Sequence, residues 1–117
     1  MGLDMWKIIK SEEIPFKPYT KGISNIKRII EKDKVGTERI AGFGLIEVPS
    51  RGVFGPHKHP EREEIYYVLS GTGSIIVGEE EIPAEQGLTL YVSGEDLHGL
   101  KNEGEKPLTV IFVTVYK

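Results

Sequence analysis

Short runs of β-branched and aromatic residues alternate with turn residues along most of the chain. In the second half these runs span residues 65–70, 74–82, 88–92, 97–102 and 108–116. β-branched and aromatic side chains fit a pleated sheet, whereas the glycine and proline residues between the runs fit turns. Short strands at this spacing predict an all-β sandwich or barrel.

Two upstream segments extend this picture. Residues 38–48 also predict a strand, in which Gly42 and Gly44 mark a bend or a close approach of another backbone. Residues 1–20 combine two prolines with three aromatic residues, which is typical of an extended arm laid over a domain.

The segment 23–32 leaves two alternatives open. Its residues Ile23, Ile26 and Ile30 fit the spacing of one helix face. Its β-branched content fits a strand equally well. The pattern alone therefore does not decide between helix and strand.

The run at 65–70 is apolar on both of its faces. In a strand, Ile65, Tyr67 and Leu69 point to one side, and Tyr66 and Val68 to the other. Both faces therefore need a cover. The barrel interior covers one, and we expect the N-terminal arm or a second subunit to cover the other.

Composition narrows the class of protein. The 117 residues, 38% of them hydrophobic, are enough for one folded domain. The net charge of -3, with basic and acidic residues interspersed, does not fit a nucleic-acid-binding surface. No apolar run is long enough to span a membrane, and the first ten residues lack a secretory core. We expect a cytoplasmic protein without nucleic-acid or membrane partners.

The candidate chemistry lies in the histidines, of which the chain has only three, while it has no cysteine. His57 and His59 are two residues apart, so on a strand they point the same way at a separation of about 6.6 Å. Glu64 follows after a turn and can face the same interior, and His98 lies on a separate predicted strand. Each residue alone fits a surface or turn position. Together they form an N₃O ligand set that suits Mn, Fe, Co, Ni, Cu or Zn.

The spacing around these residues resembles the cupin family. Its first motif, G-x5-H-x-H-x(3,4)-E-x6-G, corresponds to "GVFGPHKHPEREEIYYVLSG" at 52–71, with His57, His59 and Glu64 in register. The first glycine of this stretch is one residue closer than in the usual motif.

The second motif, G-x5-P-x-G-x2-H-x3-N, corresponds to "GLTLYVSGEDLHGLKN", with His98 and Asn102 in register. Ser93 replaces the usual proline and Glu95 the usual glycine, while Gly94 is displaced by one residue. The shape of this turn is therefore open, although the spacing to His98 is kept. The resemblance covers roughly residues 40–115.

The resemblance implies a double-stranded β-helix, or jelly-roll, barrel in which His57, His59, Glu64 and His98 bind one divalent metal, with Mn or Fe favoured and Zn, Ni, Co or Cu as alternatives. It favours a strand at 23–30 and a homodimer formed through outer sheet faces, often with exchanged N-terminal arms. Within one domain overall, residues 1–37 then form the arm and first strands, which pack on or swap with a partner barrel. Residues 38–117 form the cupin barrel.

The family includes several activities, so three functions remain open. The leading hypothesis is an oxygenase or decarboxylase-like enzyme, such as a metal-dependent dioxygenase, that acts on a small oxygen-bearing molecule. A sugar-phosphate isomerase would need a basic residue such as Lys58, Arg62 or Lys101 near the pocket. The third is a non-catalytic small-molecule-binding or sensing protein. Tyr66 and Tyr91 are candidate substrate contacts, and no catalytic residue is assigned.

Overall fold

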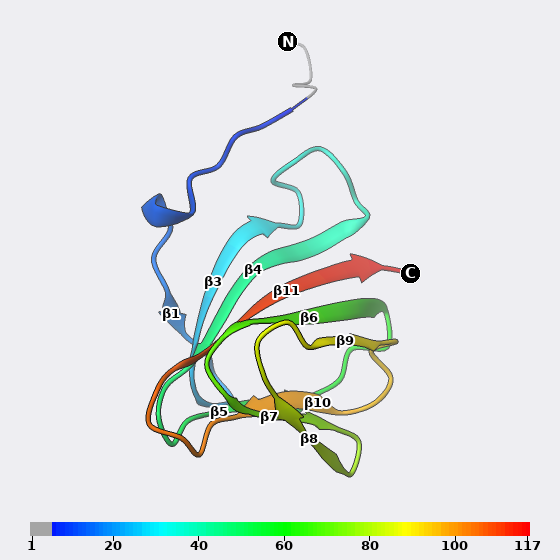
Figure 1. Ribbon diagram of the computed structural model, residues 1–117. Coiled ribbons are helices and arrows are strands. Elements are labelled where there is room, and N and C mark those ends of the chain that lie inside the picture. Colours follow the sequence, from blue (N-terminus) through cyan, green and yellow to red (C-terminus); the bar gives the residue numbers. More distant parts are fainter. Residues whose placement is uncertain (1–5) are drawn as a thin grey trace.

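The computed structural model describes residues 6–117, which fold almost entirely into antiparallel strands (Figure 1). The elements in chain order are a 3-10 turn, η1 (Ser11–Glu13), and the strands β1 (Lys17–Pro18), β2 (Gly22–Ile23), β3 (Asn25–Glu31), β4 (Ile40–Val48), β5 (Val53–His57), β6 (Arg62–Ser70), β7 (Gly73–Val77), β8 (Glu80–Ala84), β9 (Thr89–Val92), β10 (His98–Lys101) and β11 (Leu108–Tyr116). The predicted all-β class is confirmed.

Within these residues the strands form two sheets that face each other (Figure 1). A six-stranded sheet has the order β1-β3-β4-β11-β6-β9, and a five-stranded sheet has the order β2-β5-β10-β7-β8. Successive strands cross between the sheets, as β4 leads to β5 and β6 to β7. The fold is thus the double-stranded β-helix barrel expected from the motifs.

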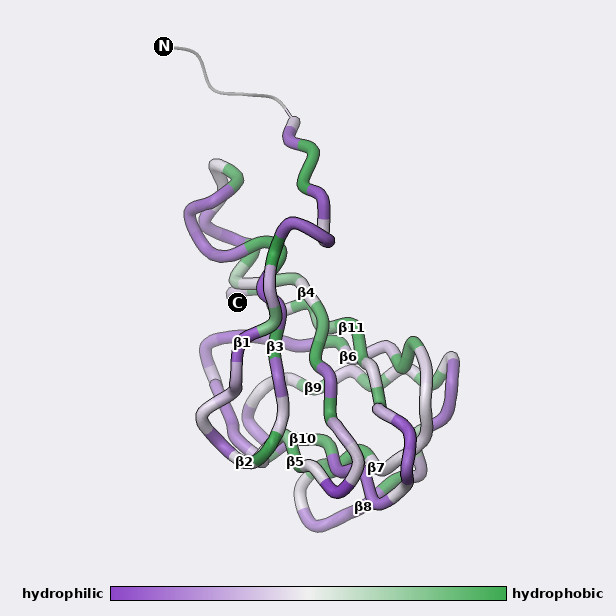
Figure 2. Tube along the Cα trace, turned by 90° about the vertical axis from the view of Figure 1, so that its left-hand side faces the viewer, coloured by the Kyte–Doolittle hydropathy of each residue, from purple (hydrophilic) through white to green (hydrophobic). Residues whose placement is uncertain are grey.

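The core lies between the two sheets, and the alternation of side chains along each strand produces it. Tyr66 and Val68 of β6 are fully buried, whereas Ile65, Tyr67 and Leu69 lie on the outer face and are about two-fifths exposed. Strands β4 and β11, which are rich in hydrophobic residues (Figure 2), bury every second side chain in the same way. The predicted division of β6 into two faces is confirmed, and its outer face is not covered by any part of residues 6–117.

The ambiguous segment is the strand β3, so the helical alternative is wrong. It pairs with β1 on one side and with β4 on the other. The register of β3 with β4 shifts between Arg28 and Ile30, and Ile26 and Ile29 are both buried. Of the three residues that fit one helix face, only Ile26 is buried, and Ile23 belongs to β2 and is 67% exposed, so their spacing does not mark a shared face.

A close backbone approach occurs at Gly44, as its sequence context predicted. A Cβ at this position would collide with the carbonyl oxygen of Lys27 on β3 and lie 3.1 Å from the ring of Phe112. The missing side chain therefore lets β3 and the Phe112 ring pack close to β4. This arrangement brings β3 close to the barrel interior.

The segment before β3 contributes to both sheets of its own chain, because β1 pairs with β3 and β2 with β5. Trp6 and Ile8, further upstream, are largely exposed. Residues 1–5 of the expected arm lie outside the described residues. Packing on or exchange with a partner barrel stays a prediction.

Within residues 6–117, no helix has the length and apolar character needed to cross a membrane.

Candidate metal centre

The four residues singled out by the motifs meet inside the barrel. Donor atoms of His57, His59, Glu64 and His98 all lie within 4.8 Å of one another. His57 ends β5 and His98 begins β10, and the two residues are paired across these neighbouring strands. Their rings are 4.7 Å apart between centroids. Strand pairing therefore places two of the imidazoles side by side.

His59 reaches the same point by a different route from the one the sequence suggested. It lies beyond the end of β5, in the turn that leads to β6, so two-residue alternation along one strand does not orient it. Its backbone N–H donates instead to the carbonyl of Gly94, at 2.9 Å. The strand-based geometry for the pair His57 and His59 is thus wrong, because the strand ends between them, although the convergence that it predicted is present.

The turn whose shape the second motif left open supports His59 directly. Gly94 has φ +94°, a left-handed conformation that glycine adopts without strain. A Cβ on Gly94 would lie 2.5 Å from the carbonyl oxygen of His59 and 3.1 Å from its Nδ1 atom. The displaced glycine therefore allows the turn to close against His59.

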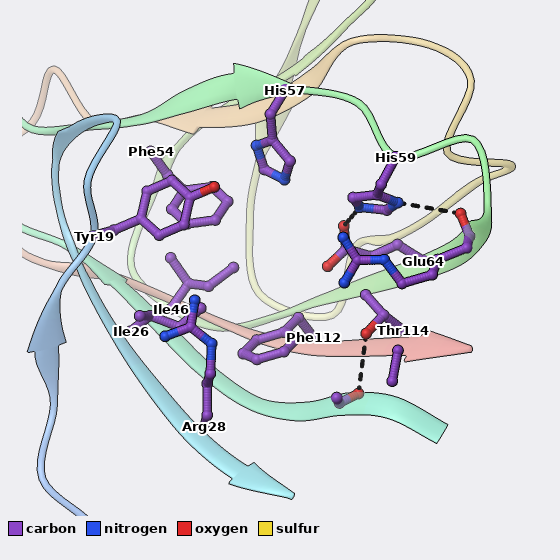
Figure 3. A pocket seen from close by; sticks show the side chains of 13 residues that line it. Tyr19, Ile26, Arg28, Ile46, Phe54, His57, His59, Glu64, Phe112 and Thr114 are labelled. Atoms are coloured by element: carbon purple, nitrogen blue, oxygen red, sulfur yellow. Dashed lines mark hydrogen bonds and ion pairs between the residues drawn. The ribbon is translucent and has the colours of Figure 1, made fainter. Parts of the chain in front are cut away.

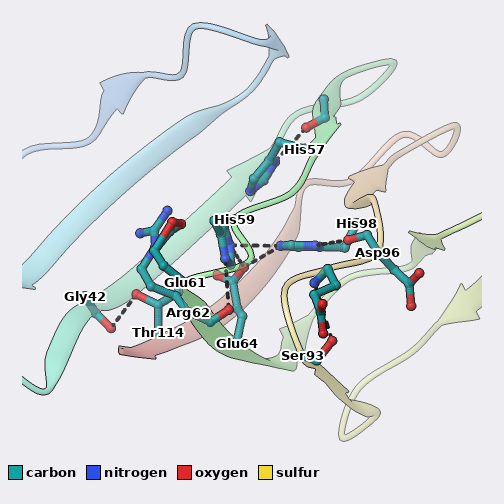
Figure 4. Close-up of polar contacts among 12 residues, drawn as sticks. Gly42, His57, His59, Glu61, Arg62, Glu64, Ser93, Asp96, His98 and Thr114 are labelled. Atoms are coloured by element: carbon teal, nitrogen blue, oxygen red, sulfur yellow. Dashed lines mark hydrogen bonds and ion pairs between the residues drawn. The ribbon is translucent and has the colours of Figure 1, made fainter. Parts of the chain in front are cut away.

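Glu64 supplies the carboxylate from β6, on the face that points into the barrel. It is 5% exposed, and its Oε1 lies 2.8 Å from Nε2 of His98 and 3.1 Å from Nε2 of His59 (Figure 4). Its neighbour Glu63 faces outwards and accepts a hydrogen bond from Tyr91. The predicted orientation of the Glu64 side chain agrees with this geometry.

The second nitrogen of each imidazole is held by the backbone. Nδ1 of His57 donates to the carbonyl of Gly55 at 2.9 Å, and Nδ1 of His98 donates to that of Asp96 at 2.9 Å. Nδ1 of His59 lies 3.2 Å from the carbonyl of Arg62. A carbonyl can only accept, so the proton of each neutral ring is on Nδ1 and the Nε2 lone pair is free to bind a cation.

The surroundings shift the protonation of the cluster in different directions. Without a metal, Nε2 of His59 donates to Glu64 only when the ring is protonated, and this hydrogen bond raises the pKa of His59, whereas burial lowers the pKa of His57. Burial would raise the pKa of Glu64, but the hydrogen bonds that the Nε2 atoms of His59 and His98 donate when they carry protons outweigh it, so the pKa of this carboxyl is lowered. Glu64 is therefore ionised at neutral pH and supplies a negative charge to the centre.

These observations fit a divalent transition metal. The Nε2 atoms of His59 and His98 are 3.1 Å apart, and neither can donate to the other when both protons are on Nδ1. A cation between such lone pairs relieves their repulsion. Three imidazole nitrogens and one carboxylate oxygen are also the donor types that Mn, Fe, Ni, Cu and Zn accept. The identity of the metal is not determined by this ligand set.

A cavity of about 120 Å³ opens beside the cluster (Figure 3). Its lining includes His57, His59 and Glu64, and also Tyr19, Ile26, Arg28, Ala41, Gly42, Ile46, Phe54, Arg62, Phe112 and Thr114. The sequence did not point to Tyr19 or Arg28, because both precede the motifs. Only the folding of the arm and of β3 over the mouth of the barrel brings them here.

The two tyrosines proposed as substrate contacts lie elsewhere. Tyr66 is fully buried in the core, with its ring centroid 5.9 Å from that of His98 and its hydroxyl without a hydrogen-bond partner among residues 6–117. Tyr91 is 58% exposed on the outer face of the six-stranded sheet. Neither lines the cavity, and a substrate contact by either stays a prediction.

Asn102, the last residue of the second motif, has structural contacts. Its Nδ2 donates to the carbonyls of Val48 at 3.0 Å and Lys106 at 2.7 Å, and its Oδ1 accepts from the N–H of Gly104 at 2.9 Å. Its buried amide thus joins the end of β4 to the loop before β11. This agrees with a hydrogen-bonding role rather than metal ligation.

A jelly-roll barrel with three histidines and one glutamate gathered in its interior defines a small β-barrel protein with a candidate metal centre. The family model described as the cupin domain matches residues 44–114, which contain all four of these residues. The chain therefore belongs to the cupin family.

Comparisons with individual proteins agree with this assignment. An uncharacterized protein of Methanocaldococcus jannaschii is 33% identical over 107 residues, which cover 90% of this chain and 84% of that protein. An oxalate-binding protein of Thermotoga maritima is 27% identical over 73 residues, which cover 62% of this chain and 60% of that protein.

Solved structures show the same fold at lower sequence identity. The crystal structure of a predicted oxalate decarboxylase from Thermotoga maritima has a TM-score of 0.85 at 22% identity, covering 95% of this chain and 100% of that one. The polyketide cyclase RemF from Streptomyces resistomycificus has a TM-score of 0.78 at 18% identity, covering 96% and 80%. The shared fold thus extends beyond the region that the family model matches.

Proposed function

We propose that the protein holds one divalent metal, Mn or Fe, and acts on a small oxygen-bearing molecule as an oxygenase or decarboxylase-like enzyme. The observation that carries this proposal is the convergence of three Nε2 lone pairs and the Glu64 carboxylate beside an open cavity. His57, His59, Glu64 and His98 would hold the metal, which when bound supplies Lewis-acid or dioxygen-activating chemistry.

The chain's own residues have separate parts in this scheme. Backbone carbonyls fix the three imidazoles in the tautomer that binds a cation. Glu64 lowers the net charge of the centre. Phe54, Phe112 and neighbouring aliphatic side chains form an apolar wall that limits water around a bound molecule. The names of the oxalate-binding protein and of the predicted oxalate decarboxylase are compatible with a small oxygen-bearing ligand.

The test is elemental analysis of protein purified without a histidine tag, followed by measurement of dioxygen uptake and of carbon dioxide release with a panel of phenols, diketones and small acids. We expect about one equivalent of transition metal per chain and turnover of at least one substrate class. Metal without any turnover would favour the non-catalytic binding protein. Protein that takes up no metal would refute the proposal.

The isomerase alternative is favoured by one observation, because Arg28 and Arg62 both line the cavity and could face a phosphate. Lys101, by contrast, is paired on the surface with Glu81 at 3.1 Å and Glu103 at 2.9 Å. One structural match is to a putative sugar phosphate isomerase from Acidithiobacillus ferrooxidans. An aldose–ketose interconversion assay with the metal-loaded protein distinguishes this activity from the first.

We further propose that the protein forms a homodimer through the outer face of the six-stranded sheet. Strand pairing places Tyr91, Ile65, Val113 and Phe43 in one row across β9, β6, β11 and β4. Ile65 and Tyr91 are 42% and 58% exposed, so this apolar row is accessible in the single chain. A contiguous apolar patch of this kind on a small domain favours a partner surface.

A further inference from the structure

We propose that the cavity binds a small acid whose carboxylate is held by Arg28, while other oxygen atoms of the acid face the cluster of His57, His59, Glu64 and His98. This inference rests on the proposed function and adds a substrate class and a specificity-determining residue. It requires a cavity with one polar end at the histidine and glutamate cluster, a second polar end at Arg28, and an apolar wall between them. The side chains that line the cavity provide all three.

Arg28 is the residue that defines the second polar end. It lies on β3 directly before the register shift, and although the residue is exposed to solvent, its side chain lines the cavity. Figure 3 shows its guanidinium directed into the cavity, near Ile46 and Phe112. Among residues 6–117, no carboxylate lies within 4.0 Å of it. Its donors are thus available to a ligand.

The charges that line the cavity favour an anion. Arg28 and Arg62 bring two positive charges, and Glu64 brings one negative charge, which is directed at Nε2 of His59 and His98. Nε of Arg62 is 3.6 Å from Oε1 of Glu61, which offsets part of its charge. A divalent metal would raise the positive excess further. A neutral ligand would leave this excess uncompensated.

The walls between the two ends are apolar. Tyr19 from the arm packs on Phe54 with ring centroids 4.3 Å apart, and Ile26, Ile46 and Phe112 line the other side. These surfaces suit a short carbon skeleton or a small ring. The Tyr19 hydroxyl adds a hydrogen-bonding group to a cavity in which few others are free.

The size of the cavity favours a carboxylate over a phosphorylated sugar. At about 120 Å³ it has room for several water-sized groups. A guanidinium binds carboxylate and phosphate alike, through paired N–H donors, so Arg28 alone does not separate them. Because the cavity is small, we favour a small acid as its ligand. The experiment tests binding of a phosphate as the alternative.

The experiment is calorimetric titration of the metal-loaded protein with oxalate, malonate and succinate, with the monoamide of each acid, and with inorganic phosphate. Wild type is compared with Arg28→Gln, with Arg28→Lys, and with Arg39→Gln as a matched control. Arg39 is an exposed arginine outside the cavity, so its replacement changes the net charge equally. Metal content and thermal unfolding are measured for every variant.

We expect at least one diacid to bind the wild type and the Arg39→Gln variant alike. Arg28→Gln should weaken this binding by roughly tenfold or more, because a hydrogen-bonded charge pair is lost. The monoamide that lacks the distal charge should bind wild type about as weakly as the diacid binds Arg28→Gln. Arg28→Lys should recover part of the affinity, since it keeps the charge without the paired donors.

Several results would overturn the inference. Equal affinity of a diacid for wild type and Arg28→Gln would show that Arg28 does not hold the carboxylate. Tighter binding of phosphate than of every diacid would show a phosphate site instead. Failure of all acids to bind a fully metal-loaded protein would refute the inference while leaving the metal centre intact. Protein without metal would remove both proposals together.

Discussion

Nε2 of His59 lies 3.1 Å from Nε2 of His98, although 39 residues separate them in the sequence. Pairing of β5 with β10 brings His98 beside His57, and the turn at Gly94 then holds His59 against the same point. With Nδ1 of each ring bound to a backbone carbonyl, the lone pairs converge. The fold has thus arranged neutral imidazoles for a cation rather than for one another.

Removing one ligand should release the metal. We expect His59→Ala to lower metal affinity by at least roughly 100-fold, since even outer-shell partners of metal ligands contribute about 10–100-fold. Lys58→Ala is the matched control, because Lys58 is the neighbouring residue and is absent from the cluster. Metal content after exhaustive dialysis and competition with a chelator measure the effect. Equal losses in both variants would contradict the site.

Metal affinity should fall as the pH falls. The raised pKa of His59 means that, without metal, this ring takes up a proton above the usual histidine value of about 6.5. Protons therefore begin to compete with the metal at neutral pH, and the competition grows on acidification. The lowered pKa of His57 keeps that ring neutral to a lower pH.

The measurement is metal content after dialysis at a series of pH values, from about 8 down to about 4, where an unperturbed histidine is fully protonated. We expect loss to start near neutral pH and to be nearly complete at the acidic end. Retention of the metal throughout the acidic range would argue against coordination by three imidazoles.

Gly94→Ala should disturb the metal centre as well as the fold. A side chain there would meet the carbonyl oxygens of His59 and Arg62, and the left-handed backbone adds about 1–2 kcal/mol of strain. Gly87→Ala is the matched control: Gly87 has φ +90° but no atom within 4 Å of its Cβ position. We expect similar backbone strain in both and weaker metal binding only in Gly94→Ala. Denaturant unfolding and metal titration separate the two effects.

The outer face of the six-stranded sheet should control assembly. We expect Tyr67→Glu to raise the dimer dissociation constant by at least roughly tenfold, because it would bury a charge at an apolar interface. Leu97→Glu introduces the same charge at an exposed apolar residue outside the sheets. Sedimentation velocity at several concentrations gives the oligomeric state. A wild-type chain that stays monomeric at high concentration would refute the proposed dimer.

The sequence predicted those features that depend on alternation and on spacing along a strand. The two faces of β6 followed from its apolar residues, and the close approach of a backbone followed from Gly44. Glu64 was placed facing the interior by the same parity, and the structure agrees. The fold class could be named because its turns and strands are short and regular.

Features that depend on packing between distant segments could not be predicted. The end of β5 falls before His59, and nothing local to the sequence marks where the ladder with β10 stops. The helical spacing of Ile23, Ile26 and Ile30 spans two strands, β2 and β3, and nothing local to the sequence marks the break between them. Arg28 and Tyr19 reach the cavity only after the arm and β3 have folded over the barrel, so no spacing relates them to the histidines.

The position of the last strand has a consequence for how the barrel is made. β11 lies between β4 and β6 in the middle of the six-stranded sheet. Until it is in place, β4 and β6 each present an open edge that can pair with other chains. During synthesis the barrel therefore depends on the residues of β11, and a product truncated before Leu108 should aggregate instead of folding.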